Sequence, residues 1–162
     1  MKKMSSLILL LIITHVSYAQ TCHEDLPRTT PDSRYEVLGS GSEVRDRVTG
    51  LIWQRCSLGQ VWDGSSCTGE AIGYTWSDAL TQAKAVGEEY RLPNVKELVD
   101  LTDQACYSSN INETFFPNTM LRPYWSSSAM RGENKIWDVS FNYGGTSKAS
   151  KNDKRYVRAV RQ

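Results

Sequence analysis

Residues 75–99 read TWSDALTQAKAVGEEYRLPNVKELV, and they contain both helices that the sequence predicts. Thr75 and Asp78 have the T-x-x-D spacing of a capping box, which satisfies free backbone groups at the start of a helix. Apolar residues then recur at helical spacing as far as Gly87, a residue type common at helix ends; they are Trp76, Ala79, Leu80, Ala83 and Val86. This segment therefore predicts a helix that ends at Gly87.

The second helix of this stretch is predicted to begin after Pro93-Asn94. Asn94 is a favoured N-cap residue, and Glu97 stands three positions later, where it can complete a capping box. The helix is expected to end before Cys106 and to bury an apolar face made of Val95, Leu98, Val99 and Leu101.

Strand-like segments stand on both sides of these helices. Short alternating or apolar runs predict three strands before them, at 35–38, 44–48 and 51–53. After a long loop at 108–123, four more are predicted, at 124–127, 136–141, 146–149 and 155–160. Strands followed by two helices and more strands predict an α+β domain in which both helices pack against an antiparallel sheet.

The start of the chain has the pattern of a secretory signal. The apolar run Leu7–Ile13 follows Lys2 and Lys3, and a small-residue site predicts cleavage before Gln20. The run is too short to span a bilayer. We therefore expect a signal peptide at 1–19, an extended arm at 20–34 and one domain at 35–162, exported to the periplasm or the exterior.

Four cysteines support an exported protein stabilised by disulfides. Three pairings are possible. Cys56 and Cys67 flank a loop rich in glycine and serine that can fold back on itself, which favours this pair and leaves Cys22 with Cys106. A zinc site would need a closer cysteine spacing and histidine ligands, so no metal is predicted.

Composition disfavours several classes of function. Residues 20–162 carry 17 basic and 18 acidic side chains, a net charge of −1, which disfavours a nucleic-acid binder. His23 is their only histidine, in the irregular arm, so catalysis by a Ser-His or Cys-His pair or by zinc is disfavoured. An enzyme that works with two carboxylates ranks last among the hypotheses, and no cofactor is predicted.

Several separated motifs give the chain a family resemblance. The motifs are Trp53–Gln60, Trp62–Gly64, Arg91–Leu98, Tyr124–Ser128 and Tyr156–Arg161. Together they resemble the Lcl C-terminal domain family, a domain of unknown function in exported bacterial proteins. The resemblance implies a C-type lectin-like fold, a distant similarity to formylglycine-generating enzymes, and binding of sulfated polysaccharides without calcium.

Three departures limit what this resemblance implies. No cysteine follows Cys106, so the oxidase activity of the formylglycine-generating enzymes is not implied. Asp138 is the one carboxylate of the Trp137-Asp138-Val139 segment, whereas a calcium site needs six to eight oxygen ligands. The collagen-like stalk of the founding member is also absent from this sequence.

Positive charge gathers at the end of the chain, where residues 146–162 have a net charge of +5. We predict an anion site there, with aromatic rings for stacking on sugars; its candidate residues are Lys148, Lys151, Lys154, Arg155, Trp137 and Tyr143. The alternative is that these lysines protect a sheet edge from aggregation. Arg158 and Arg161 are expected to pair with carboxylates inside the domain.

The leading hypothesis is a secreted, non-catalytic module that binds an anionic, sulfated glycan or another cell-surface ligand in adhesion. The second is a protein-interaction or structural component of an exported envelope assembly. A nucleic-acid partner and a membrane span are not expected in either case.

Overall fold

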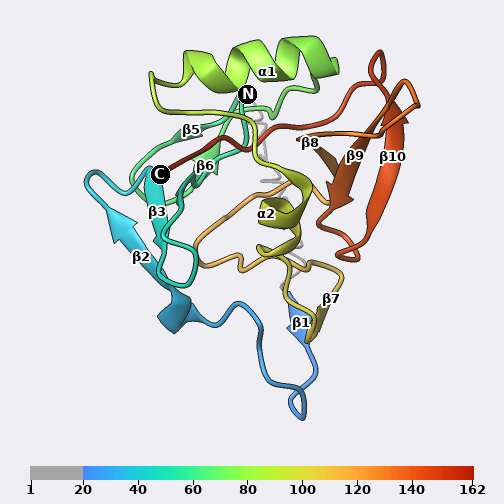
Figure 1. Ribbon diagram of the computed structural model, residues 1–162. Coiled ribbons are helices and arrows are strands. Elements are labelled where there is room, and N and C mark those ends of the chain that lie inside the picture. The colour runs from blue at the N-terminus through green and yellow to red at the C-terminus, as the bar shows by residue number, and fades with distance from the viewer. Residues whose placement is uncertain (1–19) are drawn as a thin grey trace, which may run out of the picture.

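The computed structural model describes residues 20–162, in which two antiparallel sheets stand on opposite sides of α2 (Val95–Val99), as Figure 1 shows. The other helix, α1 (Trp76–Ala85), runs along one end of both sheets in the same view. The predicted α+β class is confirmed, although the expected sheet is divided into two larger sheets and two short pairs. The predicted signal peptide at 1–19 lies outside the described residues.

Both helices begin where their caps predict. The backbone N–H of Asp78 donates to the Thr75 hydroxyl over 3.4 Å at the start of α1. At α2 the Glu97 N–H donates to the Asn94 side chain, and the Asn94 N–H donates back to the Glu97 carboxylate, so the capping box is complete. Only α2 is shorter than expected, because its helical turns end at Val99.

The four-stranded sheet joins the beginning and the end of the domain. Its order is β11-β4-β3-β2, and all its neighbours are antiparallel. The three predicted early strands are present as β2 (Tyr35–Leu38), β3 (Glu43–Asp46) and β4 (Ile52–Gln54), and β11 is Val160–Arg161.

The three-stranded sheet has the order β10-β9-β8 and separates the two helices. Its strands are β8 (Pro123–Ala129), β9 (Lys135–Ser140) and β10 (Thr146–Ser150). Trp125 and Ile136 pack in one core cluster with Ala79 of α1, while Tyr124 and Val139 pack in the other cluster with Leu98 of α2. Since side chains alternate across a strand, each face of this sheet is covered by one helix.

Two short strand pairs accompany the disulfides. β1 (Thr21–Cys22) pairs with β7 (Cys106–Tyr107) beside the Cys22–Cys106 bond, and β5 (Val61–Trp62) pairs with β6 (Cys67–Thr68) beside the Cys56–Cys67 bond. Both disulfides are the pairs that the sequence favours. They indicate an oxidising compartment outside the cytoplasm.

The arm at 20–34 is bound at both ends of an exposed stretch at 24–27 and carries a short 3-10 turn, η1 (Asp32–Arg34). The buried carboxylate of Asp103 accepts hydrogen bonds from the Arg28 guanidinium, the Thr29 N–H and the Thr30 hydroxyl. Burial alone would raise the pKa of Asp103, but these bonds and that of the Ala105 N–H hold it below its ordinary value. The arm is therefore fixed by this carboxylate as well as by Cys22.

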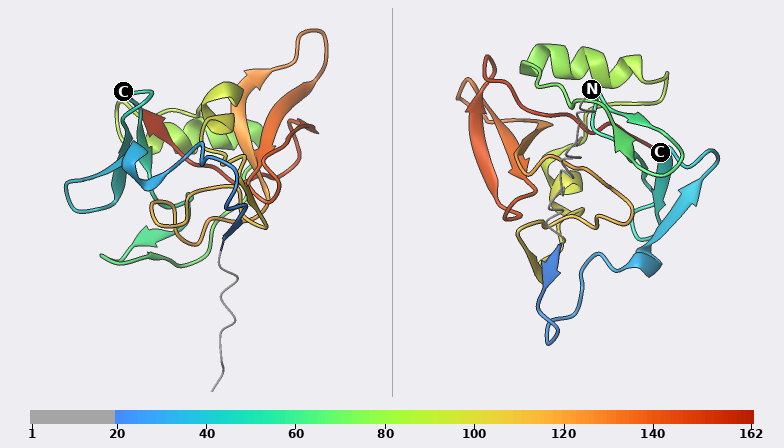
Figure 2. Two further views of the ribbon diagram at one scale, coloured as in Figure 1. Left: turned by 90° about the horizontal axis from the view of Figure 1, so that it is seen from below. Right: turned by 180° about the vertical axis from the view of Figure 1, so that it is seen from behind.

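The expected strand at 155–160 is wrong except at its last residue. Tyr156 pairs with Tyr124 in the three-stranded sheet, whereas Val160 pairs with Trp53 in the four-stranded sheet. The segment between them crosses from one sheet to the other, so it cannot remain a strand of either. Figure 2 shows this crossing from two more directions. Within residues 20–162, no helix is long and apolar enough to cross a membrane.

Candidate functional site

The predicted site residues Lys148 and Trp137 lie next to each other on β10 and β9. They are paired in register, and the Lys148 Nζ lies 5.3 Å from the centroid of the Trp137 ring. Tyr143 is exposed in the turn between the two strands. This end of the sheet therefore presents one ammonium stacked on one indole.

Lys151 lies on the other face of that sheet. Its Nζ is 5.1 Å from the centroid of the Trp76 ring, which packs against the same core cluster as Ala149. Lys148 belongs to β10 and stacks on Trp137 of β9, whereas Lys151 follows the end of β10 and stacks on Trp76 of α1, so the two ammonium groups diverge. The structure does not bring them into one site.

Arg155 has its charge compensated within the fold. Its Nε donates to the buried carboxylate of Asp138 over 2.8 Å, and its guanidinium lies 5.7 Å from the centroid of the Trp125 ring. Lys154, the residue before it, is exposed and forms no ion pair with any residue in the described part of the chain. Of these two predicted residues, Lys154 therefore has the free charge.

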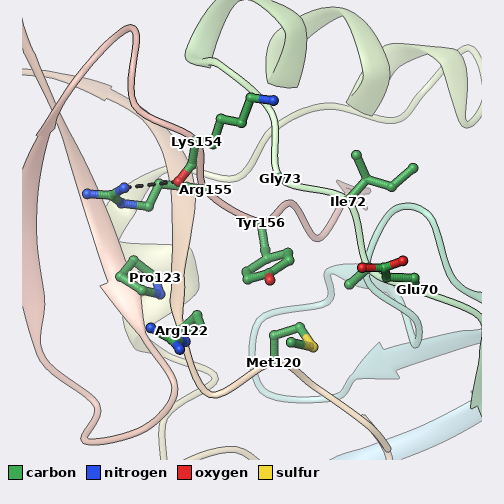
Figure 3. A pocket seen from close by; sticks show the side chains of 10 residues that line it. Glu70, Ile72, Gly73, Met120, Arg122, Pro123, Lys154, Arg155 and Tyr156 are labelled. Carbon is green, nitrogen blue, oxygen red and sulfur yellow. Dashed lines mark hydrogen bonds between the residues drawn. The ribbon is translucent and has the colours of Figure 1, made fainter.

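Lys154 and Arg155 line an open pocket of about 700 Å³. Three chain segments form its walls, and Figure 3 shows their side chains: the residues are Glu70, Ala71, Ile72 and Gly73, then Met120, Arg122 and Pro123, then Lys154, Arg155 and Tyr156. No two of these segments are close in sequence, so the pocket exists only in the folded domain.

The middle of the pocket is occupied by the ring of Tyr156, with Glu70 on the opposite side from Arg122 (Figure 3). Arg122 is exposed and, like Lys154, has no ion pair among residues 20–162. Two uncompensated cations and an aromatic ring that line one pocket can attract an anion and offer it an apolar surface for stacking.

Backbone hydrogen bonds hold the three walls together. Tyr74 and Arg155 exchange N–H to carbonyl bonds of 2.9 and 3.0 Å, which join the first wall to the third. The Tyr156 N–H donates to the Pro123 carbonyl over 3.1 Å, and the Trp125 N–H donates to the Tyr156 carbonyl over 2.9 Å. The second and third walls are therefore joined on both sides of Tyr156.

The first wall is fixed from outside by the loop that precedes the disulfide hairpin. The Ile72 N–H donates to the Leu58 carbonyl over 2.9 Å. Gly59 has a φ of +98°, and a Cβ at this position would lie 2.6 Å from the Glu70 carbonyl oxygen. Only glycine fits this close approach of two backbones without a shift.

Acid–base chemistry in this pocket would rest on Glu70, its one carboxylate. A mechanism with two carboxylates needs a partner some 5–10 Å away, and the pocket lining supplies none. Within residues 20–162, no three histidine, cysteine, aspartate or glutamate side chains are grouped so that they can hold a metal ion.

The sequence predicts Lys154 and Arg155 as site residues and misses the other eight residues that line this pocket, among them Arg122 and Tyr156. Arg122 stands in the long loop before β8, and Tyr156 was assigned to a strand of the sheet. The sequence did contain a signal for both residues, because they stand in or next to family motifs. Arg122 precedes the Tyr124–Ser128 motif, and Tyr156 is the first residue of the last motif.

The expected pairing of Arg158 is wrong, whereas that of Arg161 is confirmed. Arg161 binds both carboxylate oxygens of Glu43, at 3.0 and 3.1 Å. Arg158 is fully buried and donates to the carbonyls of Gln54 and Arg55 and to the Thr119 hydroxyl. Burial lowers the pKa of Arg158, and no carboxylate within residues 20–162 forms an ion pair with it.

One comparison with known proteins gives a match. The model of the Lcl C-terminal domain matches residues 42–161, a range that contains both helices and every residue lining the pocket. No curated protein matches the chain.

Proposed function

The chain belongs to the Lcl C-terminal domain family, as its motifs predicted, and on that premise we propose that it is a non-catalytic module that binds an anionic glycan in the pocket around Tyr156. The proposal rests on one observation: Arg122 and Lys154, which form no ion pair within residues 20–162, both line the pocket that has Tyr156 in its middle.

The chemistry of the pocket fits a sulfated or carboxylated sugar. Arg122 offers a planar fork of donors to a sulfate or carboxylate group, and Lys154 offers a mobile point charge. The apolar face of a sugar ring can stack on Tyr156, and Glu70 can accept hydrogen bonds from its hydroxyl groups. A C-type lectin-like fold is part of this proposal, supported by the order of strands, two helices and late strands.

Export is the second part of the proposal. It is supported by the signal pattern in the sequence and by two disulfides, which form in oxidising compartments. Mass spectrometry of the protein recovered outside the cytoplasm is expected to show Gln20 as the first residue. Recovery of the protein only in the cytoplasm, with residues 1–19 attached, would contradict export.

Heparin-affinity chromatography tests the pocket. The double variant Arg122→Glu, Lys154→Glu is expected to elute at a lower salt concentration than the parent and to bind heparin at least about tenfold more weakly. The matched control is Arg47→Glu, Lys135→Glu, which changes the net charge equally at two exposed residues outside the pocket. Equal retention of the pocket variant and the control would overturn the proposal.

The strand lysines are tested in the same experiment. The double variant Lys148→Glu, Lys151→Glu removes the two cations that stack on Trp137 and Trp76. We expect it to behave like the control, because the two ammonium groups lie on opposite faces of the sheet. If it alone loses retention, the anion site lies on β10, as the charge pattern of the sequence first predicted.

A protein partner is the second candidate function, and the exposure of Ile72 favours it. This side chain is 48% exposed at the edge of the pocket, and Leu121, beside the pocket residue Arg122, is 38% exposed. Apolar side chains of this kind are used in protein interfaces. A stoichiometric partner that is lost in Ile72→Glu, together with a glycan array without hits, would favour this candidate.

A further inference from the structure

A second cavity, of about 660 Å³, lies beside α1 and shares no lining residue with the pocket around Tyr156. One wall comes from α1, with Leu80, Thr81 and Lys84. The opposite walls come from the segment before α2 and from β8; they contribute Arg91, Leu92, Asn94 and Ser127. The cavity therefore lies where two of the family-type motifs meet the longer helix.

The two motifs are joined by hydrogen bonds that backbone N–H groups donate. The Ser127 N–H donates to the Pro93 carbonyl over 2.7 Å, and the Val95 N–H donates to the Ser128 hydroxyl over 3.0 Å. The Ser126 hydroxyl donates to the Trp137 carbonyl. Two of the three consecutive serines thus use their hydroxyls within the fold.

Ser127, the serine between them, lines the cavity with a free hydroxyl. In the described part of the chain its side chain makes no hydrogen bond, although its backbone is fixed. Asn94 is similar, since its side-chain oxygen caps α2 while its side-chain NH₂ has no acceptor within residues 20–162. Two hydrogen-bond donors are therefore free at the cavity wall.

The charges of the cavity have one sign. Arg91 is compensated by the Glu97 carboxylate through two bonds of 2.8 Å. Lys84 forms no ion pair with any residue in the range 20–162, and the lining contains no carboxylate. A cationic ligand would meet no partner here, whereas an anion would meet the Lys84 ammonium.

The remaining lining is apolar. Leu92 is buried and Leu80 is partly buried, and both belong to the core cluster under α1. An apolar cavity with a few donors that converge on it is the usual form of a small-molecule site.

We propose that this cavity binds a carboxylate with an apolar chain. The carboxylate pairs with the Lys84 ammonium, the chain lies against Leu80 and Leu92, and Asn94 and Ser127 donate hydrogen bonds to ligand oxygens. This site does not depend on the proposed glycan pocket, and the two are tested with different probes.

The test is a titration of the full chain, with both disulfides formed, followed by amide chemical shifts in ¹⁵N–¹H spectra. The probe is octanoate, compared with octylammonium and 1-octanol, all below their aggregation concentrations. Octanoate is expected to shift the amides of residues 80–84, 91, 92, 94 and 127, and to bind at least about tenfold more tightly than octylammonium.

Two variants define the site. Lys84→Glu is expected to weaken octanoate binding by about tenfold or more, whereas Lys135→Glu, the same change at an exposed lysine outside the cavity, leaves it within about twofold. Thr81→Trp, at an exposed helix position, is expected to fill the cavity and remove binding while the spectrum remains that of the folded protein.

The inference would be overturned by shifts confined to other residues, by equal binding of octanoate and octylammonium, or by octanoate binding that Lys84→Glu leaves unchanged. Tighter binding of 1-octanol than of octanoate would also overturn it, because the site would then be apolar without a carboxylate position. Heparin retention of Lys84→Glu reports separately on the glycan pocket.

Discussion

The Arg91 guanidinium forms two hydrogen bonds of 2.8 Å to the two carboxylate oxygens of Glu97, and one of these oxygens also accepts the Asn94 N–H over 2.7 Å. Glu97 therefore closes the capping box of α2 and fixes the segment that precedes it. Burial alone would raise the pKa of Glu97, but the bonds from Arg91 and Asn94 hold it below its ordinary value.

Removal of these bonds is expected to lower the free energy of unfolding in two steps. Glu97→Gln keeps an acceptor for the Asn94 N–H and is expected to cost about 0.5 kcal/mol, because the Arg91 side chain is 40% exposed and water screens the pair. Glu97→Ala loses both contacts and is expected to cost about 2 kcal/mol. Urea denaturation measures both free energies of unfolding. An equal loss in Glu97→Gln and Glu97→Ala would contradict the view that Glu97 both caps α2 and binds Arg91.

Arg158 is expected to be intolerant of substitution although no carboxylate faces it. Arg158→Met leaves the buried carbonyls of Gln54 and Arg55 without this donor, for which we expect a loss of about 3 kcal/mol in the free energy of unfolding. Arg158→Lys is expected to lose about 2 kcal/mol, since one ammonium cannot reproduce the planar fork.

Urea denaturation of both Arg158 variants checks this, with Arg47→Lys as the control at an exposed arginine. If Arg158→Met is as stable as the parent, the cost of burying the guanidinium equals the gain from its hydrogen bonds.

Acid is expected to destabilise the domain through Asp103. Its pKa is lower in the folded protein than in the unfolded chain, so the unfolded state binds more protons as the pH falls. The stabilisation is complete above the ordinary aspartate pKa of about 4 and is lost as the pH falls through the folded value.

Asp103→Asn is expected to lower the unfolding free energy by about 2 kcal/mol at pH 7, because Arg28 loses its anionic partner. The difference in unfolding free energy between the variant and the parent is expected to become smaller as the pH falls below about 4. Thermal unfolding at a series of pH values measures this. Asp46, Glu43 and Glu97 also have lowered pKa values, so the variant should keep part of the acid sensitivity. If the unfolding free energies of variant and parent differ by the same amount at all pH values, Asp103 does not contribute to the acid sensitivity.

Gly59 and Gly64 form a matched pair that tests the first wall of the glycan pocket. Both have positive φ values, +98° and +103°, but a Cβ at Gly59 would meet the backbone of residues 70 and 72, whereas a Cβ at Gly64 meets nothing within 4 Å. Gly64→Ala is expected to cost about 1 kcal/mol from strain alone.

Gly59→Ala is expected to cost more than about 2 kcal/mol and also to weaken heparin retention, because the wall that carries Glu70 and Ile72 must shift. Unchanged retention in Gly59→Ala would show that this wall does not contribute to the glycan site.

Local signals explain which elements were predictable. The caps at Thr75 and Asn94 fixed the helix starts, and the turn after Leu38 fixed the first hairpin. The pairs β1–β7 and β5–β6 were missed because each strand has two residues, too few for a visible pattern. The segment before Val160 was misassigned because its partners lie in two different sheets.

The candidate site was predictable only in part, because its residues are brought together by contacts between segments that are distant in sequence. The charge pattern led to Lys154, which lines the pocket around Tyr156. It also grouped Lys148 with Lys151, but these two lysines stack on different indole rings, those of Trp137 on β9 and Trp76 on α1. Arg122 was missed because only tertiary packing brings its loop beside the last motif.

The crossing segment has one more consequence, for the thermodynamics of binding. Tyr156 lies in the proposed glycan pocket, and two residues later Arg158 is fixed in the core by its bonds to β4 and to the residue that follows β4. The pocket floor is thus preorganised, so a ligand loses little free energy to ordering it. Affinity would then be limited by desolvation of the two cations and by the flexibility of the glycan itself.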